Sequence, residues 1–436
     1  MLNGVRPLSL ADLPAEPRLR PVFESETPAV VVFPVSHAVG LSVIRTLEDH
    51  GIPILAVDFK PRAAGLYSNR VSPLLLPELG RDEAAFESGM IEIGRRFRTR
   101  PVLFLVHDEY LFPSLKNQPA WERVYRIPLS PWPVVETIVD KGRFYRRLAE
   151  AGYPIPRTWF MNGAADLEAQ SGDITFPCIL KPTYSTAFRR RFGVKARRFD
   201  DLAALSAFAR EVSAAGIAFL VQEFIEGPAE ALWTYAAYSD DDGNVLAEFT
   251  GRKRHQFPPD FGTCRLGESV ASPELAALGR RLLKILGYRG ISLTEFKRGP
   301  DGAFKVIELN PRPGDWPERL AQLCGANLVL AAYRASVGLP VAPATISRFG
   351  VKWANLAEDF YYSVRGYRLA GYPEAHRGFL GWLRDLGGVE TDAFWSWRDP
   401  MPALVRFSDM MRDFARRERE WARARAARTP AARAAS

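Results

Sequence analysis

The chain has 436 residues, of which 47% are hydrophobic and 25% charged, and this ordinary globular composition excludes a mostly disordered, collagen-like or disulfide-scaffold protein. The 58 lysine and arginine residues exceed the 50 acidic residues by only +8, which does not identify a nucleic-acid-binding protein. Half of this excess lies between Asp409 and Ser436, where eight arginines accompany four acids.

The three cysteines, Cys178, Cys264 and Cys324, are far apart and form no Cys-x-x-Cys pair, which is typical of a reducing compartment. The stretch Met1–Glu26 has no apolar signal region. No run approaches the roughly 20 apolar residues of a transmembrane helix. We therefore expect a cytoplasmic protein with no transmembrane segment.

Residues 1–28 predict a flexible lead-in, and residues 29–135 alternate between short apolar strands and helices. Continuous apolar strands separated by helices indicate a parallel sheet covered on both faces. Polar residues at or just past the strand ends could contact substrate or simply cap the loops, and the sequence leaves both open: His37, Asp58 and Asp108. The expected strands are Ala29–Pro34, Ile52–Val57 and Pro101–Val106, with helices over 40–51 and 82–97.

A proline-rich stretch after residue 127 precedes a second domain, 136–345, with an α+β and mainly antiparallel pattern. Its expected strands are 176–181, 218–224, 231–238, 245–252, 291–297 and 304–309, and its expected helices are 141–152, 200–214 and 273–286. Residues 346–436 predict a helical, aromatic-rich C-terminal extension that ends in a basic tail helix.

The hairpin around Asp301–Gly302 carries the strongest chemical signal. A two-residue turn pairs Glu295 with Glu308, and two carboxylates directly opposite on one face repel each other. Glu308 shares its face with Val306 and Asn310, because alternate strand residues point the same way, while residues 307 and 309 would face a core. A divalent cation would remove the repulsion, and Mg²⁺ prefers such oxygen ligands together with phosphate. The alternative is a solvated pair of surface acids.

Two lysines stand where phosphate could bind. Lys181 ends an apolar strand, and Lys141 follows Asp140, a candidate N-cap at a helix start. Each alone is more typical of a surface lysine whose stem packs on apolar groups.

An apolar strand ends at Glu223 and is followed by Gly227 and Glu230, where backbone groups could pair with adenine and a carboxylate with ribose hydroxyls. The alternative is an edge strand and its turn. The basic clusters Arg189–Arg191 and Arg252–Arg254 could be solvated faces or could bind RNA, but no nucleic-acid motif accompanies them.

In this order the motifs resemble the ATP-grasp superfamily, and within it the carboxylate–amine ligases related to D-aspartate ligase. The resemblance covers roughly residues 29–340. It rests on the segments Asp140–Lys141, Ile179–Pro182, Gln222–Gly227 with Glu230, Leu293–Phe296 and Ile307–Arg312, and on the loop segments Thr250–Pro259 and Gly262–Gly267. One departure concerns the expected loop Thr183–Lys195, which is usually glycine-rich in the superfamily and here has one glycine and three consecutive arginines.

The resemblance implies a role for each matched residue. Lys141 and Lys181 would hold the α- and β-phosphates of ATP. Glu223 and Ile225 would offer backbone atoms to adenine, and Glu230 would bind ribose. The implied metal ligands, for one or two Mg²⁺ with Mn²⁺ as an alternative, are Glu295, Glu308 and Asn310. The implied contacts to the γ-phosphate or acyl phosphate are Arg252 and Arg312.

The expected function is therefore ATP-dependent amide or peptide-bond formation through an acyl phosphate, with small carboxylate and amine substrates such as amino acids or peptides. Two alternatives stay open: a non-catalytic nucleotide-binding protein and a kinase that stops at the acyl phosphate. No specific nucleic-acid partner is expected, and a homodimer is left open.

The basic tail predicts an amphipathic helix over Ser408–Arg428 with Met411, Phe414, Ala415 and Trp421 near one face. We favour a helix packed on the body of the protein. The alternative is a contact with an anionic partner, such as a membrane surface or an acidic carrier.

Overall fold

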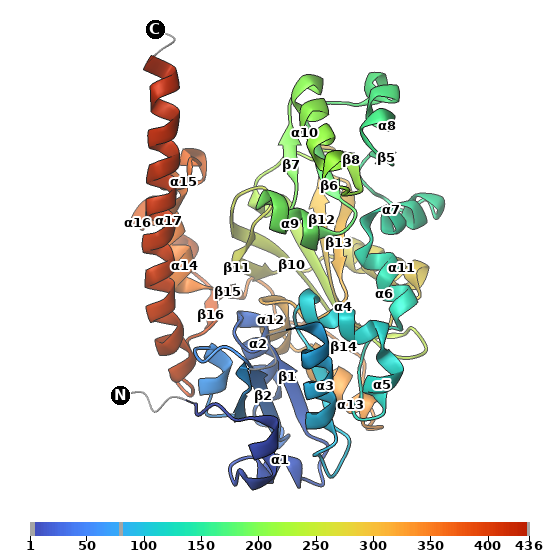
Figure 1. Cartoon of the computed structure of the whole chain (residues 1–436), viewed down its shortest axis with the longest axis vertical. Helices are drawn as coiled ribbons and strands as arrows, with labels where there is room; N and C mark the ends of the chain where they lie inside the picture. The colour runs from blue at the N-terminus through green and yellow to red at the C-terminus, as the bar shows by residue number, and fades with distance from the viewer. Residues whose placement is uncertain (1–4, 78–81, 434–436) are drawn as a thin grey trace.

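The computed structural model describes residues 5–77 and 82–433. The part of the chain up to Val139, which we call the front part, runs from blue to turquoise in Figure 1. It is built on a parallel four-stranded sheet with the order β3-β2-β1-β4. The parallel sheet is confirmed, and β3 is a strand that the sequence reading missed. The strands are β1 (Val30–Phe33), β2 (Ile54–Asp58), β3 (Ser72–Leu75) and β4 (Val102–Leu105). The helices are α2 (Ala38–Leu47), α3 (Glu83–Gly94), α4 (Asp108–Lys116), α5 (Gln118–Glu122) and α6 (Trp132–Val139).

The N-terminal segment is not a flexible lead-in where the structure describes it. It forms η1 (Leu10–Ala15) and α1 (Arg20–Phe23). Leu13, Leu19 and Val22 are buried in the same core as the outer face of β1 and β2. The prediction for residues 5–28 is therefore wrong, because the apolar side chains between the prolines contribute to this core.

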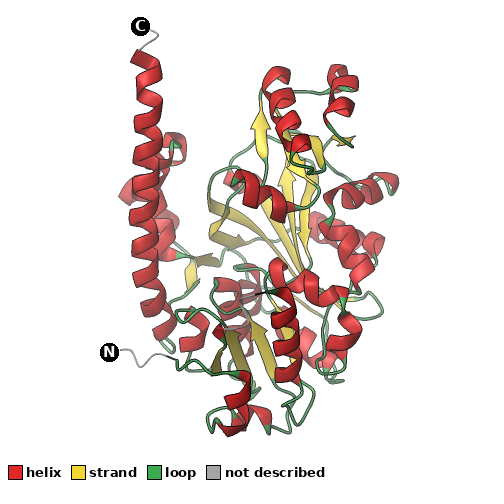
Figure 2. Ribbon diagram, in the orientation of Figure 1, coloured by secondary structure: helices red, strands yellow, loops and turns green. Residues whose placement is uncertain are grey.

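An antiparallel four-stranded sheet, β5-β8-β6-β7, forms the top of the view in Figure 2 with the helices that cover it. Its strands are β5 (Thr158–Met161), β6 (Cys178–Pro182), β7 (Arg197–Phe199) and β8 (Phe219–Glu223). The helices in this part of the chain are α7 (Lys141–Glu150), α8 (Ala164–Ala169), α9 (Ser185–Phe192) and α10 (Leu202–Ala214).

The largest sheet has eight strands and follows the order β13-β12-β9-β10-β11-β15-β16, with β14 beside β10. Its first five strands are antiparallel, as expected. They are β9 (Leu232–Ser239), β10 (Val245–Phe257), β11 (Thr263–Ser269), β12 (Gly290–Arg298) and β13 (Phe304–Asn310). The helices of this part are α11 (Pro273–Leu286), α12 (Pro317–Leu323) and α13 (Leu328–Ser336).

The C-terminal extension is helical, as predicted, and also lengthens the large sheet. It contributes β14 (Ala344–Thr345), β15 (Lys352–Ala354) and β16 (Val389–Asp392). Its helices are α14 (Leu356–Tyr361), a π-helical turn η6 (Tyr362–Gly366), α15 (Tyr367–Ala370), α16 (Gly378–Asp385) and the long α17 (Met401–Arg433), red in Figure 1. Within the described part of the chain, no helix combines the length and apolarity that crossing a bilayer requires.

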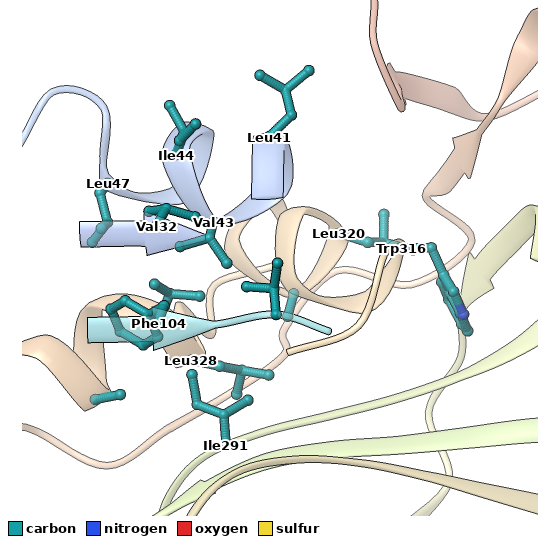
Figure 3. Packing of buried hydrophobic residues seen from close by; sticks show 14 of the residues in the cluster. Val32, Leu41, Val43, Ile44, Leu47, Phe104, Ile291, Trp316, Leu320 and Leu328 are labelled. Atoms are coloured by element: carbon teal, nitrogen blue, oxygen red, sulfur yellow. The ribbon is translucent and has the colours of Figure 1, made fainter. Parts of the chain in front are cut away.

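One continuous core joins the front part to the large sheet. Val32 and Phe104 of the parallel sheet, Leu320 of α12 and Ile291 of β12 belong to the same buried cluster, part of which Figure 3 shows. Helices α12 and α13 contact α2 of the front part and β10 of the large sheet, so the same two helices join both sheets. The division at residues 135 and 136 stays a prediction.

The helix α17 packs on the extension rather than standing free. Phe414 stacks on Tyr361 at 3.8 Å between ring centroids, and Met410 is buried beside it. Met411 is 49% exposed and Ala415 is also exposed, so the apolar stripe runs through residues 405, 410 and 414 instead. The packed helix is the favoured reading, and a contact with an anionic partner stays a prediction.

Candidate active site

A cavity of about 650 Å³, which we call the central cleft, opens between the antiparallel sheet and the large sheet. Strands β6 and β8 supply one wall, through residues such as Lys181 and Glu223. Strands β12 and β13 supply another, through Glu295 and Glu308. The front part and α17 border the same space, so four separate segments of the chain meet here.

The hairpin of β12 and β13 places Glu295 opposite Glu308, the pairing that the sequence predicted. The turn itself is different. Gly299 pairs with Ala303 around a three-residue loop, and Gly302 has a positive φ of 79°. This loop shifts the register by one residue, and a bulge at Ile307 shifts it back before Glu308. The predicted pairing of Glu295 with Glu308 is correct because the register shift from the three-residue loop and the opposite shift from the bulge cancel.

The bulge also changes which residues share a face. Val306 lies in the core with Leu309, whereas Ile307 borders the cleft together with Glu308 and Asn310. The expected placement of Val306 beside Glu308 is therefore wrong, and so is that of Ile307 in the core. The hydroxyl of Tyr145 donates to the Ile307 carbonyl and holds the bulged backbone in place.

The two carboxylates have different partners. Asn310 Nδ2 donates to Glu308 Oε1 at 3.3 Å, and Lys253 Nζ lies 2.8 Å from Glu295 Oε1. Burial alone would raise the pKa of Glu308, but the ammonium groups of Lys195 and Lys141 lower it to about 2. Glu308 is thus an ionised carboxylate at neutral pH.

This donor set suits a hard divalent cation only in part. Among residues 5–77 and 82–433, no three His, Cys, Asp or Glu side chains gather closely enough to hold a metal by themselves. Glu295, Glu308 and Asn310 offer two carboxylates and an amide, which leaves coordination positions to be filled by phosphate oxygens or water, as Mg²⁺ commonly requires.

The two predicted lysines both line the cleft. Lys181 is buried and donates to Gln222 Oε1 at 2.9 Å, and Lys141 donates to Ser185 Oγ at 3.2 Å. Asp140 caps α7 as expected, since its side chain accepts from the Arg143 N–H. Burial and the charge of Lys141 lower the pKa of Lys181 to about 7, so an anion in the cleft would restore its charged form.

The glycine-poor stretch after Lys181 is a helix rather than a loop. The side chain of Phe188 in α9 is buried against Phe192 and Phe208, and Gly193 ends the helix in the left-handed conformation at φ 73°. The single glycine is therefore a helix cap. From this stretch Ser185 and Lys195 reach the cleft, so phosphate contacts would come from side chains.

The segment after β8 has a backbone arrangement that could receive an adenine edge. The N–H groups of Glu223 and Phe224 already donate to Arg157 and Pro177 carbonyls, at 2.9 and 3.1 Å. Among the described residues, none accepts from the Ile225 N–H. Glu223 and Ile225 line the cleft, and Lys305 pairs with the Glu223 carboxylate.

Glu230 does not border the cleft. It forms an ion pair with Arg377 of the extension at 3.2 Å, so the structure gives no support to its expected contact with ribose. Two other polar residues, Asp260 and Lys297, line the cleft together with Phe224.

The two predicted arginines have different surroundings. Arg312 lines the cleft and forms a two-point ion pair with Asp108 of the front part, which orients its guanidinium. Arg252 lies outside the cleft and pairs with Glu268 at 3.0 Å. Its neighbour Lys253 lies inside and is buried. The expected contact of Arg252 with the γ-phosphate or acyl phosphate stays a prediction, and Lys253 is a cleft residue that the sequence reading did not single out.

The three polar residues at the strand ends of the front part have different roles. Asp58 accepts from the N–H groups of Val35 and Lys60, both at 2.9 Å, and so caps the loops. His37 lines the cleft and stacks on His107 at 5.4 Å. Burial and the neighbouring His107 lower the pKa of His37 to about 4, so His37 is neutral at pH 7.

Asp315 is a further cleft residue that the sequence reading did not single out. Among the described residues, no lysine, arginine or histidine nitrogen lies within 4.0 Å of its carboxylate, and none donates a hydrogen bond to it. Burial raises the pKa of Asp315 above its ordinary value, although Lys253 and Arg265 oppose the shift. Its place directly after the Asn310–Arg312 motif was the available signal.

The glycines of the Gly262–Gly267 segment are needed for close packing. A Cβ on Gly267 would lie 2.4 Å from a ring atom of Trp316, and one on Gly262 would lie 2.1 Å from the Phe257 backbone. The segment forms β11 rather than a loop for most of its length. Its role is to bring β11 and Trp316 together beneath the cleft.

No family model matches the chain. Among curated proteins, it is 25% identical over 247 residues to the arginine-specific large chain of carbamoyl phosphate synthase from Eremothecium gossypii, covering 54% of this chain and 21% of that protein. It is also 25% identical over 189 residues to D-alanine–D-alanine ligase from Stutzerimonas stutzeri, covering 40% and 56%. The chain thus matches about a fifth to just over half of these relatives' lengths.

Solved structures resemble it over most of its length. A biotin carboxylase complex with β,γ-ATP from Campylobacter jejuni superposes with a TM-score of 0.58 and 16% identity, covering 74% of each chain. An L-amino acid ligase from Bacillus licheniformis superposes with a TM-score of 0.53 and 19% identity, covering 71% and 74%. At these identities the likeness establishes the fold.

Proposed function

We propose that this chain, which has the ATP-grasp fold and whose relatives are ligases of that superfamily, is an ATP-dependent carboxylate–amine ligase that forms an amide or peptide bond. The observation that carries the proposal is the meeting of Glu295, Glu308 and Asn310 with Lys141 and Lys181 in one cleft. Carboxylates for a divalent cation and ammonium groups for phosphate are the groups that a phosphoryl-transfer site needs.

The residues would divide the work by charge. Lys141 and Lys181 would bind phosphates of ATP, and the backbone at Glu223 and Ile225 would bind adenine. Mg²⁺, held by Glu295, Glu308 and Asn310, would neutralise charge on the phosphates when bound. Arg312, oriented by Asp108, would contact the group being transferred.

The reaction would have two steps. A carboxylate oxygen attacks the γ-phosphorus, which forms an acyl phosphate and releases ADP as the bond to the β-phosphate oxygen breaks. An amine nitrogen then attacks the acyl carbon, and phosphate leaves as the amide forms. An amine that enters as an ammonium ion must lose a proton before its nitrogen can attack, and we assign Asp315 to accept that proton, because it faces the cleft without a cationic partner among the described residues. The second proton, lost as the amide forms, leaves with the phosphate.

Lys253 would act through Glu295. Its ammonium lies 2.8 Å from that carboxylate and fixes the position of the carboxylate in the cleft. Amino acids are the first candidate substrates for this chain, supported by its likeness to D-alanine–D-alanine ligase and L-amino acid ligase. Peptides are the second candidate class, as the sequence resemblance implies.

The test is an ADP-release screen with Mg-ATP and pairs of amino acids and peptides, run beside a hydroxylamine trap. We expect ADP release that requires a carboxylate substrate and increases with an amine, together with an amide product. Tight Mg-ATP binding with no ADP release under any pair would instead identify a non-catalytic nucleotide-binding protein. Hydroxamate without any amide product would identify a kinase that stops at the acyl phosphate.

A further inference from the structure

The side of the central cleft that the C-terminal extension borders carries three arginines that the proposed chemistry does not use. Arg406 and Arg417 project from α17 and Arg265 from β11, and all three border the cleft. We call them the arginine wall. They lie on the side of the cleft that α14 and α17 close, and α17 belongs to the part of the chain outside the ATP-grasp resemblance.

Two of these arginines share one carboxylate. Arg265 Nη1 lies 2.9 Å from Glu358 Oε2, and Arg406 Nη2 lies 3.1 Å from Glu358 Oε1. Burial would raise the pKa of Glu358, but Arg265 and Arg406 hold it below its ordinary value. Asp413 adds a weaker contact to Arg406 at 3.6 Å and also pairs with Arg416 at 2.9 Å.

The third arginine has no acidic partner in the part of the chain that the structure describes. Arg417 Nη1 donates to the Tyr362 hydroxyl, and no described carboxylate lies within 4.0 Å of its guanidinium. Tyr362 is buried, and the Arg265 guanidinium lies 5.6 Å from the centre of its ring. Arg265 and Arg406 thus have carboxylate partners within 4.0 Å, whereas Arg417 has none among the described residues. A half-buried guanidinium without such a partner is stabilised by a further anion.

The helix that carries Arg417 is fixed in position against the front part. Arg62 Nε lies 2.8 Å from Asp409 of α17, and its Nη2 donates to the Val405 carbonyl at 3.2 Å. The stacking of Phe414 on Tyr361 holds the same helix against α14. The arginine wall is therefore a rigid part of the cleft, as a binding site requires.

We propose that the arginine wall binds an anionic group, a carboxylate or a phosphate, on a substrate of the reaction, at a point separate from the group that reacts. Guanidinium groups recognise both anions through paired N–H donors. The chain would thus select a substrate with an additional negative charge, such as an amino acid bound through a carboxylate that is not activated. This inference rests on the proposed ligase function and names the substrate class for it.

Binding measurements test the site without turnover. The full chain, loaded with Mg-ADP, is titrated calorimetrically with each of the twenty L-amino acids, with their α-carboxamides, with O-phospho-L-serine and with inorganic phosphate. We expect at least one carboxylate or phosphate compound to bind, and the counterpart that lacks that anionic group to bind at least tenfold more weakly. The α-carboxamide pairs identify a requirement for the α-carboxylate, aspartate and glutamate against asparagine and glutamine identify a requirement for a side-chain carboxylate, and phosphoserine against serine identifies a requirement for a phosphate.

Arg417→Ala should weaken binding of the preferred anion by about 10- to 100-fold, as loss of a charged hydrogen bond does. Arg419→Ala is the matched control, since Arg419 lies two positions along α17 with its side chain exposed; its affinity should equal that of the wild type. Equal affinity in Arg417→Ala, equal binding of every acid and its matching amide (the α-carboxamides, and asparagine and glutamine beside aspartate and glutamate) together with equal binding of phosphoserine and serine, or no binding by any anionic compound would each overturn the proposal. The wild-type comparison of acids with amides decides the matter even where Arg417→Ala does not fold.

ADP release separates this inference from the proposed function. An anion that binds through Arg417 in a protein that never releases ADP would refute the ligase and keep the anion site. ADP release with unchanged anion binding in Arg417→Ala would keep the ligase and refute the anion site.

Discussion

Binding of Mg-ATP should be accompanied by proton uptake at Lys181, because this lysine is partly deprotonated in the free protein at neutral pH. Its pKa of about 7 results from burial and from repulsion by Lys141. About half of the free protein therefore has a neutral Lys181 at pH 7, and about nine tenths at pH 8. Phosphate beside Lys181 favours the ammonium form, so the bound complex should have a raised pKa.

The direction in which the affinity for Mg-ATP changes with pH follows from this shift in the pKa of Lys181. A group that is more basic in the complex takes up a proton on binding, and affinity falls as pH rises between the two pKa values. With a bound pKa near the ordinary value of 10.5, Mg-ATP should bind about 50-fold more weakly at pH 9 than at pH 7. At pH 8, binding should take up about 0.9 proton.

Calorimetry in two buffers with different ionisation enthalpies measures the uptake directly. Lys181→Arg is the matched variant, since a guanidinium stays charged across this range; its uptake should fall to the level contributed by other groups, and its affinity should depend less on pH. Wild-type uptake near zero at pH 8, or an equal pH dependence in Lys181→Arg, would refute the assignment of Lys181 to phosphate.

Three further predictions concern other parts of the site. Lys253→Met should lower kcat/KM for ADP release by at least 100-fold because Glu295 loses its counter-ion. Arg252→Ala, outside the cleft, should change kcat/KM by less than about threefold, a loss of well under 1 kcal/mol. Equal effects of the two substitutions would contradict the assignment of Lys253, rather than Arg252, to the cleft. Asp315→Asn should abolish amide formation with a substrate that enters as an ammonium ion. Hydroxamate formation should continue, because hydroxylamine is largely unprotonated at pH 7 and needs no base before it attacks. Loss of both products in a folded variant would show that Asp315 has a role other than accepting this proton. Gly267→Ala should lower the free energy of unfolding by about 1–3 kcal/mol, because the new Cβ would lie 2.4 Å from the Trp316 ring. The change is measured as a lower denaturation midpoint. An unchanged midpoint would mean that the Trp316 ring can move aside at no cost in stability.

Much of the architecture could be predicted because it follows from local sequence patterns, such as the spacing of apolar residues and the residues that cap helices. The helix α11 begins and ends at the residues that periodicity and its capping signals indicate, and the apolar strands of the front part pair in parallel as expected. The pairing of Glu295 with Glu308 was also predicted, but for an incomplete reason. The bulge at Ile307 receives a hydrogen bond from the hydroxyl of Tyr145, a contact that the hairpin sequence does not reveal.

Two features that the sequence reading did not identify, the buried face of β10 and the helix α9, had recognisable sequence patterns. Ala247, Phe249 and Gly251 alternate along β10 on its buried face, and the same alternation places Lys253, not Arg252, on that face. Phe188 and Phe192, four residues apart before Gly193, indicate a helix with a glycine cap where a loop was expected.

The remaining features depend on contacts between distant parts of the chain. The ion pair of Arg62 with Asp409 joins residues 347 positions apart, and it helps to bring α17 to the cleft. Helical periodicity could indicate that α17 packs on something, but it could not indicate what. The arginine wall is visible only once the extension is folded against the front part.

ADP release by a Glu308→Gln protein tests the proposed ligase chemistry most directly, because this substitution removes one negative charge from the paired carboxylates and nearly preserves their shape. Glu274→Gln, on the exposed face of α11, is the control for the same chemical change. Wild type and Glu274→Gln should release ADP at equal rates with Mg-ATP, a carboxylate and hydroxylamine, and folded Glu308→Gln should release none. ADP release at the wild-type rate by folded Glu308→Gln would contradict the assignment of the cleft as a metal-dependent ligase site.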